Sequence, residues 1–414
     1  MRSYKLNLSL NFPFFLARRI VFKGHRTFSK LIVRVTIGAL ALAVIAIILS
    51  VAILRGFKDE VTAKQRGFFS DVIISKNDLN DSYENSPISL SSGDLDRILR
   101  LSNVVDVVPF ATKAGVMNVD GEVEGVLLKG VDKNYDQSFL ARTLVAGDTL
   151  NFVDRDSDTE ILISKLLSDR LNLKVGDDFI MYFVQKPIRK RKMFVKGVFQ
   201  TNSAELDKMY VIGSLDLIRR LNNLGEADAG AYEVRVENFD DIQQTTAAVD
   251  EELPVTLKAT NIIEQFPDVF NWLKMLDMND DIIFVLMVIV AVINMISALL
   301  ISILERTSMI GILKSLGMAN RQIRKIFLYN SIYLIGCGLV LGNIITIGLY
   351  FFQTNTRFFK LDPSIYYIEY VPMSITWYDV VLLNLAIVFI ALVTLYIPSM
   401  LISRISPIKT IQFK

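Results

Sequence analysis

Cysteine and histidine are almost missing from this 414-residue sequence, which contains one of each. Because Cys337 is the only cysteine, no disulfide can form within the chain. His25 is the only histidine, so a zinc site built from several histidines is excluded, and a Ser-His-Asp triad would have to use His25. This histidine stands in a basic N-terminal segment. We therefore expect neither a catalytic residue nor a metal ligand in this chain.

A phosphate-binding loop is also missing, since the pattern G-x-x-x-x-G-K-[ST] does not occur. Gly311 and Gly317 form the nearest glycine pair, but no Lys-Ser or Lys-Thr follows them. Asp154, Asp156 and Asp158 resemble the start of a calcium loop, but the glycine that should follow is absent, and the acidic residue Glu160 comes too early. We expect no cofactor bound by this chain.

Charge is missing from four long apolar runs, Val35–Leu54, Ile282–Leu304, Ile326–Phe352 and Val380–Ile402. A helix needs roughly 20 apolar residues to cross a membrane. Buried helices of a large soluble protein are the alternative, but four uncharged runs of this length favour membrane spans. The first run is too long for a secretory signal and no A-x-A site follows it, so it predicts an uncleaved signal anchor.

The basic residues predict the orientation of these spans, because cytoplasmic loops are enriched in Lys and Arg. They gather before the first span, between the second and third spans, and after the fourth span. The members of these groups are Arg18, Arg19, Lys23, Arg26, Lys30, Arg34, Arg306, Lys314, Arg321, Arg324, Lys325, Arg404, Lys409 and Lys414. The predicted segments are a cytoplasmic N-terminus (1–34), span one (35–54), an outer domain (55–278), span two (279–304), a cytoplasmic loop (305–325), span three (326–352), an outer loop (353–379), span four (380–402) and a cytoplasmic tail (403–414).

The segment between the first two spans has the composition of a soluble domain. Residues 56–276 contain 26 Lys and Arg against 36 Asp and Glu. Helical patterns cover Ser92–Leu101, where Ser92 is the expected N-cap, and Leu166–Leu173, which Gly176 follows as a turn residue. Runs with a strand pattern are Asp71–Ser75, Gly125–Val131, Glu160–Ser164, Asp178–Val184, Phe194–Phe199, Met209–Ile212 and Tyr232–Val236. This mixture predicts an α+β domain.

The loop between spans two and three contains a short amphipathic helix. Met309, Ile312, Leu313 and Leu316 have i, i+3, i+4, i+7 spacing and so form one apolar stripe. We expect Ser308 to cap this helix, Gly317 to end it, and Asn320 to cap the next helix. Such a helix either lies on the membrane surface, with its basic residues near lipid headgroups, or docks in the groove of a cytoplasmic partner. The spacing alone does not decide between them.

A basic segment, Lys186–Lys192, separates two strand-like runs of the acidic domain. Pro187 interrupts the strand pattern, which predicts a loop or hairpin tip over the whole segment. The basic residues are either a solvated surface loop or a site that attracts an acidic partner.

Several of these motifs together resemble a known family. The segment Glu305–Phe327 (ERTSMIGILKSLGMANRQIRKIF) resembles the coupling segment of FtsX-like ABC permeases. Val292–Ser297 and the glycines of span three are similar to that family as well. The outer loop Leu361–Pro372, with Asp362, Pro363, Tyr366 and Tyr367, resembles the lipoprotein-releasing (LolC/LolE type) branch. Arg55–Glu60 and Ser406–Ile411 resemble motifs of the same branch, so the resemblance covers the whole chain.

The resemblance implies a membrane α-helical fold of four transmembrane helices, with a large α+β periplasmic domain inserted between helices 1 and 2. This is the MacB/FtsX-like, type VII ABC permease architecture of the bacterial inner membrane. It also implies that the chain is not itself an enzyme. ATP and magnesium would be bound by a separate cytoplasmic ATPase dimer (LolD-like). The other implied partners are a second permease subunit, identical or related, membrane lipid, a lipoprotein substrate and a periplasmic lipoprotein carrier (LolA-like). Nucleic acid is not among them.

The resemblance also implies roles for particular residues. The helix that couples to the ATPase comprises Glu305, Arg306, Met309, Ile312, Leu313, Lys314, Leu316 and Gly317. The hairpin that holds the carrier comprises Pro187, Ile188, Arg189, Lys190, Arg191 and Phe194. The segment Thr201–Asp207 departs from the pattern of the branch. The expected function is extraction of lipoproteins from the inner membrane. The alternatives are a MacB-like peptide or drug exporter, an FtsX-like regulator of a cell-wall hydrolase, and a membrane-anchored receptor.

Overall fold

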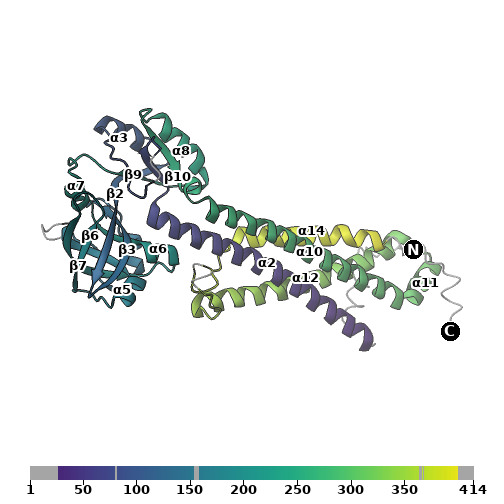
Figure 1. Cartoon of the computed structure of the whole chain (residues 1–414). Coiled ribbons are helices and arrows are strands. Elements are labelled where there is room, and N and C mark those ends of the chain that lie inside the picture. Colours follow the sequence, from purple (N-terminus) through teal and green to yellow (C-terminus); the bar gives the residue numbers. More distant parts are fainter. Residues whose placement is uncertain (1–26, 80–81, 153–157, 363–365, 367, 400–414) are drawn as a thin grey trace, which may run out of the picture. The chain divides into compact units, whose positions relative to one another are not determined.

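The computed structural model describes residues 27–79, 82–152, 158–362, 366 and 368–399 (Figure 1). The predictions for Asp154, Asp156, Pro363 and Tyr367 lie outside these residues, as do those for the basic residues Arg18, Arg19, Lys23, Arg26, Arg404, Lys409 and Lys414. The chain divides into two compact units. The membrane unit comprises the described residues up to Phe57, Lys274–Phe359 and those from Val371 onward. The outer unit comprises Lys58–Leu273 and the described residues of Lys360–Tyr370.

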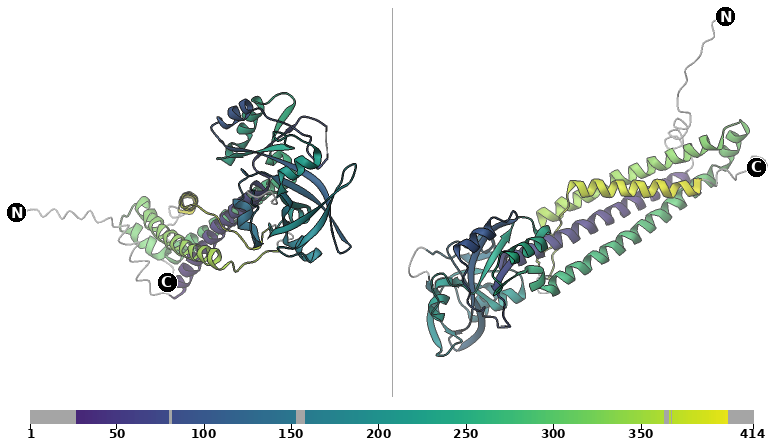
Figure 2. Two further views of the ribbon diagram at one scale, coloured as in Figure 1. Left: turned by 90° about the vertical axis from the view of Figure 1, so that its left-hand side faces the viewer. Right: turned by 90° about the horizontal axis from the view of Figure 1, so that it is seen from above.

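Four helices in the described part of the chain are long and apolar enough to cross a membrane. They are α2 (Thr27–Phe69), α10 (Pro267–Glu305), α12 (Asn320–Thr356) and α14 (Trp377–Ser399) (Figure 2). Each contains a predicted span or most of one. Helices α2 and α10 both continue well beyond their apolar runs toward the outer unit. Proline suits the first residue of α10, because that position needs no N–H donor.

Small and polar residues hold the membrane helices together. A Cβ atom on Gly338 or Gly342 of α12 would lie 2.8 Å from Leu40 or Val44 of α2, so only glycine permits this close approach. Asn343 of α12 and Asn384 of α14 exchange two amide hydrogen bonds of 2.8 and 3.0 Å. Such a reciprocal pair satisfies both amides where little water is available.

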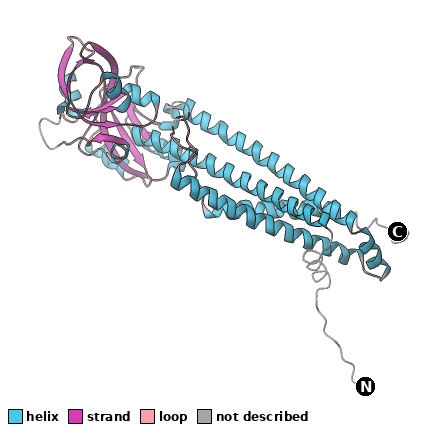
Figure 3. Cartoon of the chain, turned by 90° about the horizontal axis from the view of Figure 1, so that it is seen from below, coloured by secondary structure: helices cyan, strands magenta, loops and turns pink. Residues whose placement is uncertain are grey.

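The outer unit contains the strands and is built from two parts (Figure 3). The first is a four-stranded antiparallel sheet in the order β10-β1-β9-β2, with two helices packed against it. Its elements in chain order are β1 (Val72–Lys76), α3 (Ser92–Leu99), β2 (Val104–Val119), β9 (Ala231–Val236), α8 (Ile242–Glu251) and β10 (Leu257–Asn261). This βαββαβ order with these neighbours is the ferredoxin-like arrangement.

The second part is a small closed barrel inserted between β2 and β9. The second half of β2 continues into it, and the strands pair around the ring in the order β2-β3-β8-β5-β7-β6, with β6 returning to β2. The new strands are β3 (Glu122–Val131), β5 (Glu160–Ser164), β6 (Asp178–Phe183), β7 (Arg189–Phe199) and β8 (Tyr210–Ser214). Met117, Leu128, Ile161, Met181 and Met193 are completely buried in its core cluster. Closure leaves these strands without unpaired edges.

Short elements surround the barrel and the sheet. They are α4 (Ser138–Thr143), β4 (Leu144–Gly147), α5 (Lys165–Leu171), α6 (Ala204–Met209), α7 (Leu215–Asn222), η2 (Phe239–Asp241) and α9 (Ile262–Gln265). The predicted membrane helices and α+β domain are confirmed, and all seven predicted strands are present. Strands β2, β4 and β10 were not predicted. The N-cap of α3 is Ser91 rather than Ser92, because Ser91 and Asp94 form a reciprocal capping box.

Candidate functional site

The inner end of α10 leads into the short helix α11 (Thr307–Ser315). Gly317 ends it as predicted, with a φ of 87°; its N–H donates to the carbonyl of Lys314 and that of Met318 to Leu313, both at 3.0 Å. This is a Schellman motif. The two predicted caps are wrong. Arg306 and Ala319 precede α11 and α12 without side-chain caps, so Ser308 and Asn320 already lie inside these helices.

The structure divides the predicted apolar stripe of α11. Met309 and Leu313 are half-buried and pack into the core of the membrane unit beside Ile310, which is completely buried. Ile312 and Leu316 instead leave 55% and 79% of their surface exposed. The four residues therefore do not form one exposed face. The free apolar surface of this loop is Ile312 with Leu316, which we call the inner patch.

The charged residues predicted to orient this helix lie around it. Glu305, Arg306 and Lys314 are all half-buried. Each therefore presents only part of its side chain to a partner. Their role in binding an ATPase stays a prediction.

The predicted basic hairpin is formed by β6 and β7, which pair antiparallel from Asp178–Phe194 to Phe183–Arg189. The connection between them is residues 184–188 and contains Pro187. The prediction of a loop over all of Lys186–Lys192 is wrong, because the residues from Arg189 onward belong to β7. Long basic side chains reach solvent from a strand while their backbone groups stay in the ladder.

Three of the basic side chains make contacts within the outer unit, and the guanidinium of Arg191 donates to the carbonyl of the adjacent Lys190 at 2.8 Å. The guanidinium of Arg189 donates to the carbonyl oxygens of Arg220 and Leu221 at 3.0 and 2.9 Å. These carbonyls belong to the C-terminal turn of α7, where a cation is favourable. Lys192 forms an ion pair of 3.1 Å with Asp178 and lies 5.4 Å from the ring centre of Phe194. Arg189 therefore anchors the hairpin.

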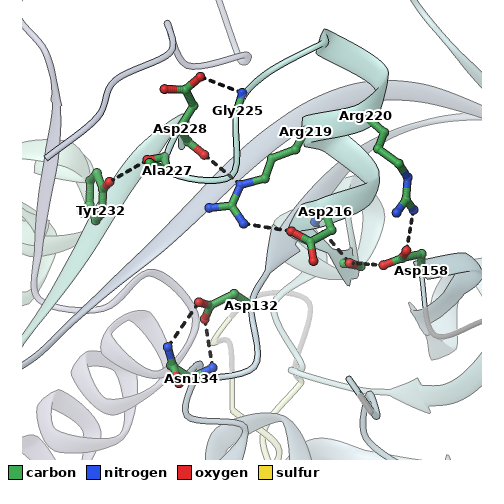
Figure 4. A network of polar contacts seen from close by, with 11 residues as sticks. Asp132, Asn134, Asp158, Asp216, Arg219, Arg220, Gly225, Ala227, Asp228 and Tyr232 are labelled. Carbon is green, nitrogen blue, oxygen red and sulfur yellow. Dashed lines mark hydrogen bonds and ion pairs between the residues drawn. The ribbon is translucent and has the colours of Figure 1, made fainter. Parts of the chain in front are cut away.

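A polar network fixes α7, to which Arg189 attaches (Figure 4). Arg219 donates to the carbonyl of Asp228 at 2.9 Å and pairs with Asp216 at 2.8 Å. Arg220 pairs with Asp158 at 2.5 Å. The end of the hairpin next to its connection is thus held by a helix that is itself tied to two neighbouring loops.

The hairpin and the start of β3 carry exposed apolar side chains that the motif did not predict. Val123, Ile180, Val184 and Phe194 leave 60%, 41%, 60% and 39% of their surfaces exposed. The register pairs Ile180 with Lys192 and Phe194 with Asp178, and directly paired residues point to the same face. We call these four residues the outer strip. The alternation in Asp178–Val184 was the signal for it.

At the tip of the hairpin, the side chains of Ile188, Lys190 and Arg191 are exposed, Ile188 by 72%. Lys190 is paired with Tyr182 and shares the face of the outer strip, whereas Arg191 is paired with Met181 and belongs to the other face of the ladder. This surface combines apolar side chains with cations, which suits an amphipathic or acidic partner.

The predicted outer-loop motif is described only in part. The N–H of Tyr366 donates to the carbonyl of Asp362 at 3.0 Å, and the N–H of Leu361 donates to Glu369 at 2.9 Å. The described residues of the motif therefore lie in a turn that follows the antiparallel bridge between Lys360 and Tyr370. Its function stays a prediction.

The segment after this loop straps helix α2 inside the membrane unit. A Cβ atom on Gly56 would lie 2.8 Å from the backbone of Pro372 and Met373. The N–H of Ser374 donates to the carbonyl of Ala52 at 2.9 Å, and Arg55 pairs with Asp379. Glycine is required at position 56 because a larger residue would push the strap away.

The outer end of α2 is anchored in the outer unit by charged groups. Arg66 forms a two-contact ion pair with Asp71, which is completely buried, and also donates to the carbonyl of Val236 at 3.2 Å. Asp71 in turn accepts the N–H of Val236 at 2.8 Å. The guanidinium lies 4.8 Å from the ring centre of Phe239. These contacts join the helix end to β9.

A second group of contacts, centred on Lys129, holds the last turn of α2. Lys129 of β3 donates to the carbonyl of Phe68 and pairs with Glu233 of β9 at 2.6 Å, and each charged residue is 1% exposed. Burial lowers the pKa of Lys129, but the charge of Glu233 and the contacts with Glu233 and Tyr135 together outweigh it, so the pKa is raised and the ammonium stays charged. The rings of Phe68, Phe110 and Tyr135 lie 5.2–5.4 Å from this ammonium. We call the contacts of Arg66 and Lys129 the α2 anchor.

No cluster of three or more potential metal ligands occurs among the residues that the structure describes. The charged groups in the α2 anchor are paired with each other rather than directed into a cleft. What the chain offers is a helix firmly attached at its outer end, an inner patch and an exposed outer strip.

Comparisons with known proteins agree with this architecture. The MacB-like periplasmic core domain family matches residues 35–252, and the FtsX-like permease C-terminal family matches residues 282–407. The chain is 21% identical to the lipoprotein-releasing system transmembrane protein LolC of Neisseria meningitidis, over 95% of this chain and 96% of that protein. It is 20% identical to LolE of Haemophilus influenzae, over 97% of this chain and 100% of that protein.

A solved structure is also similar. The periplasmic region of MacB from Actinobacillus actinomycetemcomitans covers 50% of this chain and 95% of its own length, with 15% identity and a TM-score of 0.34. The periplasmic core family spans more than half of the sequence, and the permease family spans three of the four membrane helices. The chain therefore belongs to the FtsX-like ABC permeases with a MacB-like periplasmic core domain, and it is an inner-membrane protein whose large domain lies in the periplasm.

Proposed function

We propose that this chain is the permease subunit of an ABC complex that extracts lipoproteins from the inner membrane and passes them to a periplasmic carrier. The observation that carries the proposal is the similarity to LolC and LolE, which runs through 95% and 97% of the chain. It includes both the inner patch and the hairpin. A separate ATPase subunit would bind and hydrolyse ATP, and a second permease subunit would complete the complex.

In this proposal the inner patch, Ile312 and Leu316, docks in a groove of the ATPase. The patch follows α10 directly, and α10 is one continuous helix from Pro267 to Glu305. Closure of the ATPase dimer would therefore move α10 as a rod. The half-buried Met309 and Leu313 would transmit the force to the membrane unit, into which they pack.

The hairpin would receive the carrier. Its outer strip would supply apolar contact area, Lys190 positive charge on the same face, and Arg191 positive charge from the other face of the ladder. A soluble carrier of acylated proteins must itself present an apolar opening, so an apolar strip with a basic tip is a suitable docking surface. Arg189 would hold this surface in place through α7 rather than contact the carrier.

Reconstitution tests this function. The purified chain, its ATPase and its second permease subunit would be reconstituted in vesicles together with a lipoprotein whose acyl chains lie in the leaflet on the side of the periplasmic domain. A soluble carrier would then be added outside the vesicles. We expect ATP-dependent appearance of lipoprotein bound to the carrier. ATP hydrolysis without transfer of any lipoprotein, but with export of a peptide or drug, would reject lipoprotein release and favour the exporter alternative.

A further inference from the structure

The outer unit contains a hollow at the ends of strands β5 and β7. These neighbouring strands are parallel, and their last residues, Ser164 and Phe199, are paired. Helix α5 follows β5, and residues 200–203 and then α6 follow β7 (Figure 1). The carboxyl ends of parallel neighbours meet at one edge of a sheet, so these two segments lie side by side. Between them is a hollow of about 420 Å³ that water can enter, which is the size of a ligand site.

One wall of the hollow is a loop fixed by hydrogen bonds. The carboxylate of Asp207 accepts the N–H and the hydroxyl of Thr201 at 3.1 and 2.7 Å, and the N–H of Asn202 at 3.2 Å. Thr201 and Asp207 are 1% and 5% exposed, so water does not compete for these bonds. They hold Asn202 at a φ of 61°. The loop therefore presents its other side chains in fixed positions before any ligand arrives.

Two amide side chains of this loop, those of Gln200 and Asn202, line the hollow. The NH₂ group of Gln200 donates to the side-chain carbonyl of Asn202 at 2.6 Å. This bond leaves the carbonyl of Gln200 as an acceptor and the NH₂ group of Asn202 as a donor. Each is one carbon away from a bonded atom, so the two lie close together. A peptide group also has one donor and one acceptor, so the amide pair is complementary to the backbone of an extended peptide.

The other wall belongs to α5 and carries charges of both signs. Lys165 pairs with Asp169, and Arg170 pairs with Glu124 of β3 at 3.2 Å. Because each cation already has a carboxylate partner, a free anion would have to displace one. In the described part of the chain, none of the side chains that line the hollow is aromatic, so it offers no ring for a flat ligand to stack on. The walls therefore favour a peptide over a small anion or a ring-shaped ligand.

We propose that this hollow binds an extended, unfolded polypeptide segment through its backbone. The source of the segment rests on the proposed function: it is the part of the lipoprotein that follows the acylated end. A folded carrier has its backbone N–H and C=O groups paired within its own structure, whereas an unfolded segment has them free. Recognition of the backbone does not depend on the side chains, so one site accepts lipoproteins of different sequence.

Photolabelling of the full-length protein in lipid nanodiscs tests the site without relying on transport. One probe is a short peptide of alternating serine and alanine that carries a diazirine, and the second is the same peptide with its backbone nitrogens methylated. We expect the first probe to label α5 and residues 200–207, as mapped by mass spectrometry. The second has no N–H to donate to Gln200 and should label them about fivefold less. Equal labelling by both probes, or labelling only elsewhere, would overturn the site.

Two substitutions change the hollow without altering the core. Ala204 is exposed and lines the hollow, so Ala204→Tyr should fill it and abolish labelling. Glu205→Tyr, at the next exposed residue of α6 and outside the lining, is the size-matched control and should label normally. Asn202→Gly removes the amide but keeps the backbone N–H, and glycine accepts the positive φ, so labelling should fall about fivefold. Normal labelling of both Ala204→Tyr and Asn202→Gly would overturn the site, and thermal unfolding identifies any variant that does not fold.

A crosslink in the reconstituted complex tests the source of the segment. The photoreactive residue p-benzoylphenylalanine is placed at Asp169, which lines the hollow, or at the control position Val255, which is 92% exposed. We expect the first to crosslink the lipoprotein next to its acylated end and the second to give no such crosslink. Lipoprotein release without this crosslink, or with a crosslink to the carrier alone, would overturn this source and leave the proposed function intact. A complex that releases no lipoprotein would overturn the proposed function and this source together, while the peptide labelling still decides the site.

Discussion

The Lys129–Glu233 pair of the α2 anchor allows a quantitative prediction. Replacing Lys129 with Met removes the ammonium but leaves the Glu233 carboxylate in a site that is 1% exposed. An uncompensated buried charge costs about 3–5 kcal/mol. The double substitution Lys129→Met with Glu233→Leu removes both charges and keeps similar volumes. It should be far less destabilising, because it loses chiefly the hydrogen bond to the Phe68 carbonyl, about 1 kcal/mol.

The double-mutant cycle measures this difference as a coupling energy. Equilibrium unfolding of the purified protein by denaturant would give the free energy of unfolding for the wild type, both single variants and the double variant. With about 3–5 kcal/mol for each single substitution and about 1 kcal/mol for the double, we expect a coupling energy of about 5–9 kcal/mol between Lys129 and Glu233. If Lys129→Met unfolds at the same denaturant concentration as the wild type, the pair does not carry a buried charge interaction and the reasoning is wrong.

The double variant also tests the mechanical role of the anchor. It should fold, but the carbonyl of Phe68 at the end of α2 loses the donor that Lys129 supplies. Backbone amides at the outer end of α2 should then exchange faster with solvent, because the last turn opens more often. In the reconstituted complex we expect ATP turnover to continue while lipoprotein release per ATP falls. Unchanged release would show that the anchor through Lys129 is not needed for coupling.

Three further predictions concern surfaces and close contacts. Leu316→Glu should abolish copurification of the ATPase with little change in thermal stability, since Leu316 is 79% exposed, and normal copurification would argue against docking at the inner patch. Gly56→Ala should destabilise the protein by about 1–3 kcal/mol in thermal unfolding, because its Cβ meets the strap backbone at 2.8 Å, whereas Gly38→Ala in the same helix meets no atom within 4 Å and should not destabilise it. Lys190→Ser with Arg191→Ser should reduce crosslinking to the carrier but leave assembly with the ATPase unchanged. Crosslinking at the wild-type level would show that these two side chains do not contact the carrier.

Features that depend on local sequence were predictable. The four spans follow from apolar length, and the end of α11 follows from Gly317, because its conformation depends only on adjacent residues. Strand β5 was predicted with its observed bounds because its short apolar run is flanked by polar residues. In each case the physical cause lies within a few residues of the pattern.

Features that depend on distant pairing were not predictable. Strand β2 contains Asp106, Pro109 and Lys113, and it contributes first to the sheet and then to the barrel, so no single alternation runs through it. The pairing of Lys129 with Glu233 joins β3 to β9 across the whole barrel insertion. In α11, Met309 and Leu313 pack into the core beside Ile310, whereas Ile312 and Leu316 stay exposed. The burial of Ile310 depends on other helices, so the spacing of the apolar residues in α11 does not predict it.

Helix α2 has residues in both the membrane unit and the outer unit. It runs without a break from Thr27 to Phe69 and contains no proline. In the membrane unit the strap holds it between Ala52 and Gly56, and in the outer unit the α2 anchor holds it at Arg66 and Phe68. Because α2 belongs to both units, loosening either attachment should impair lipoprotein release while ATP hydrolysis continues in the reconstituted complex.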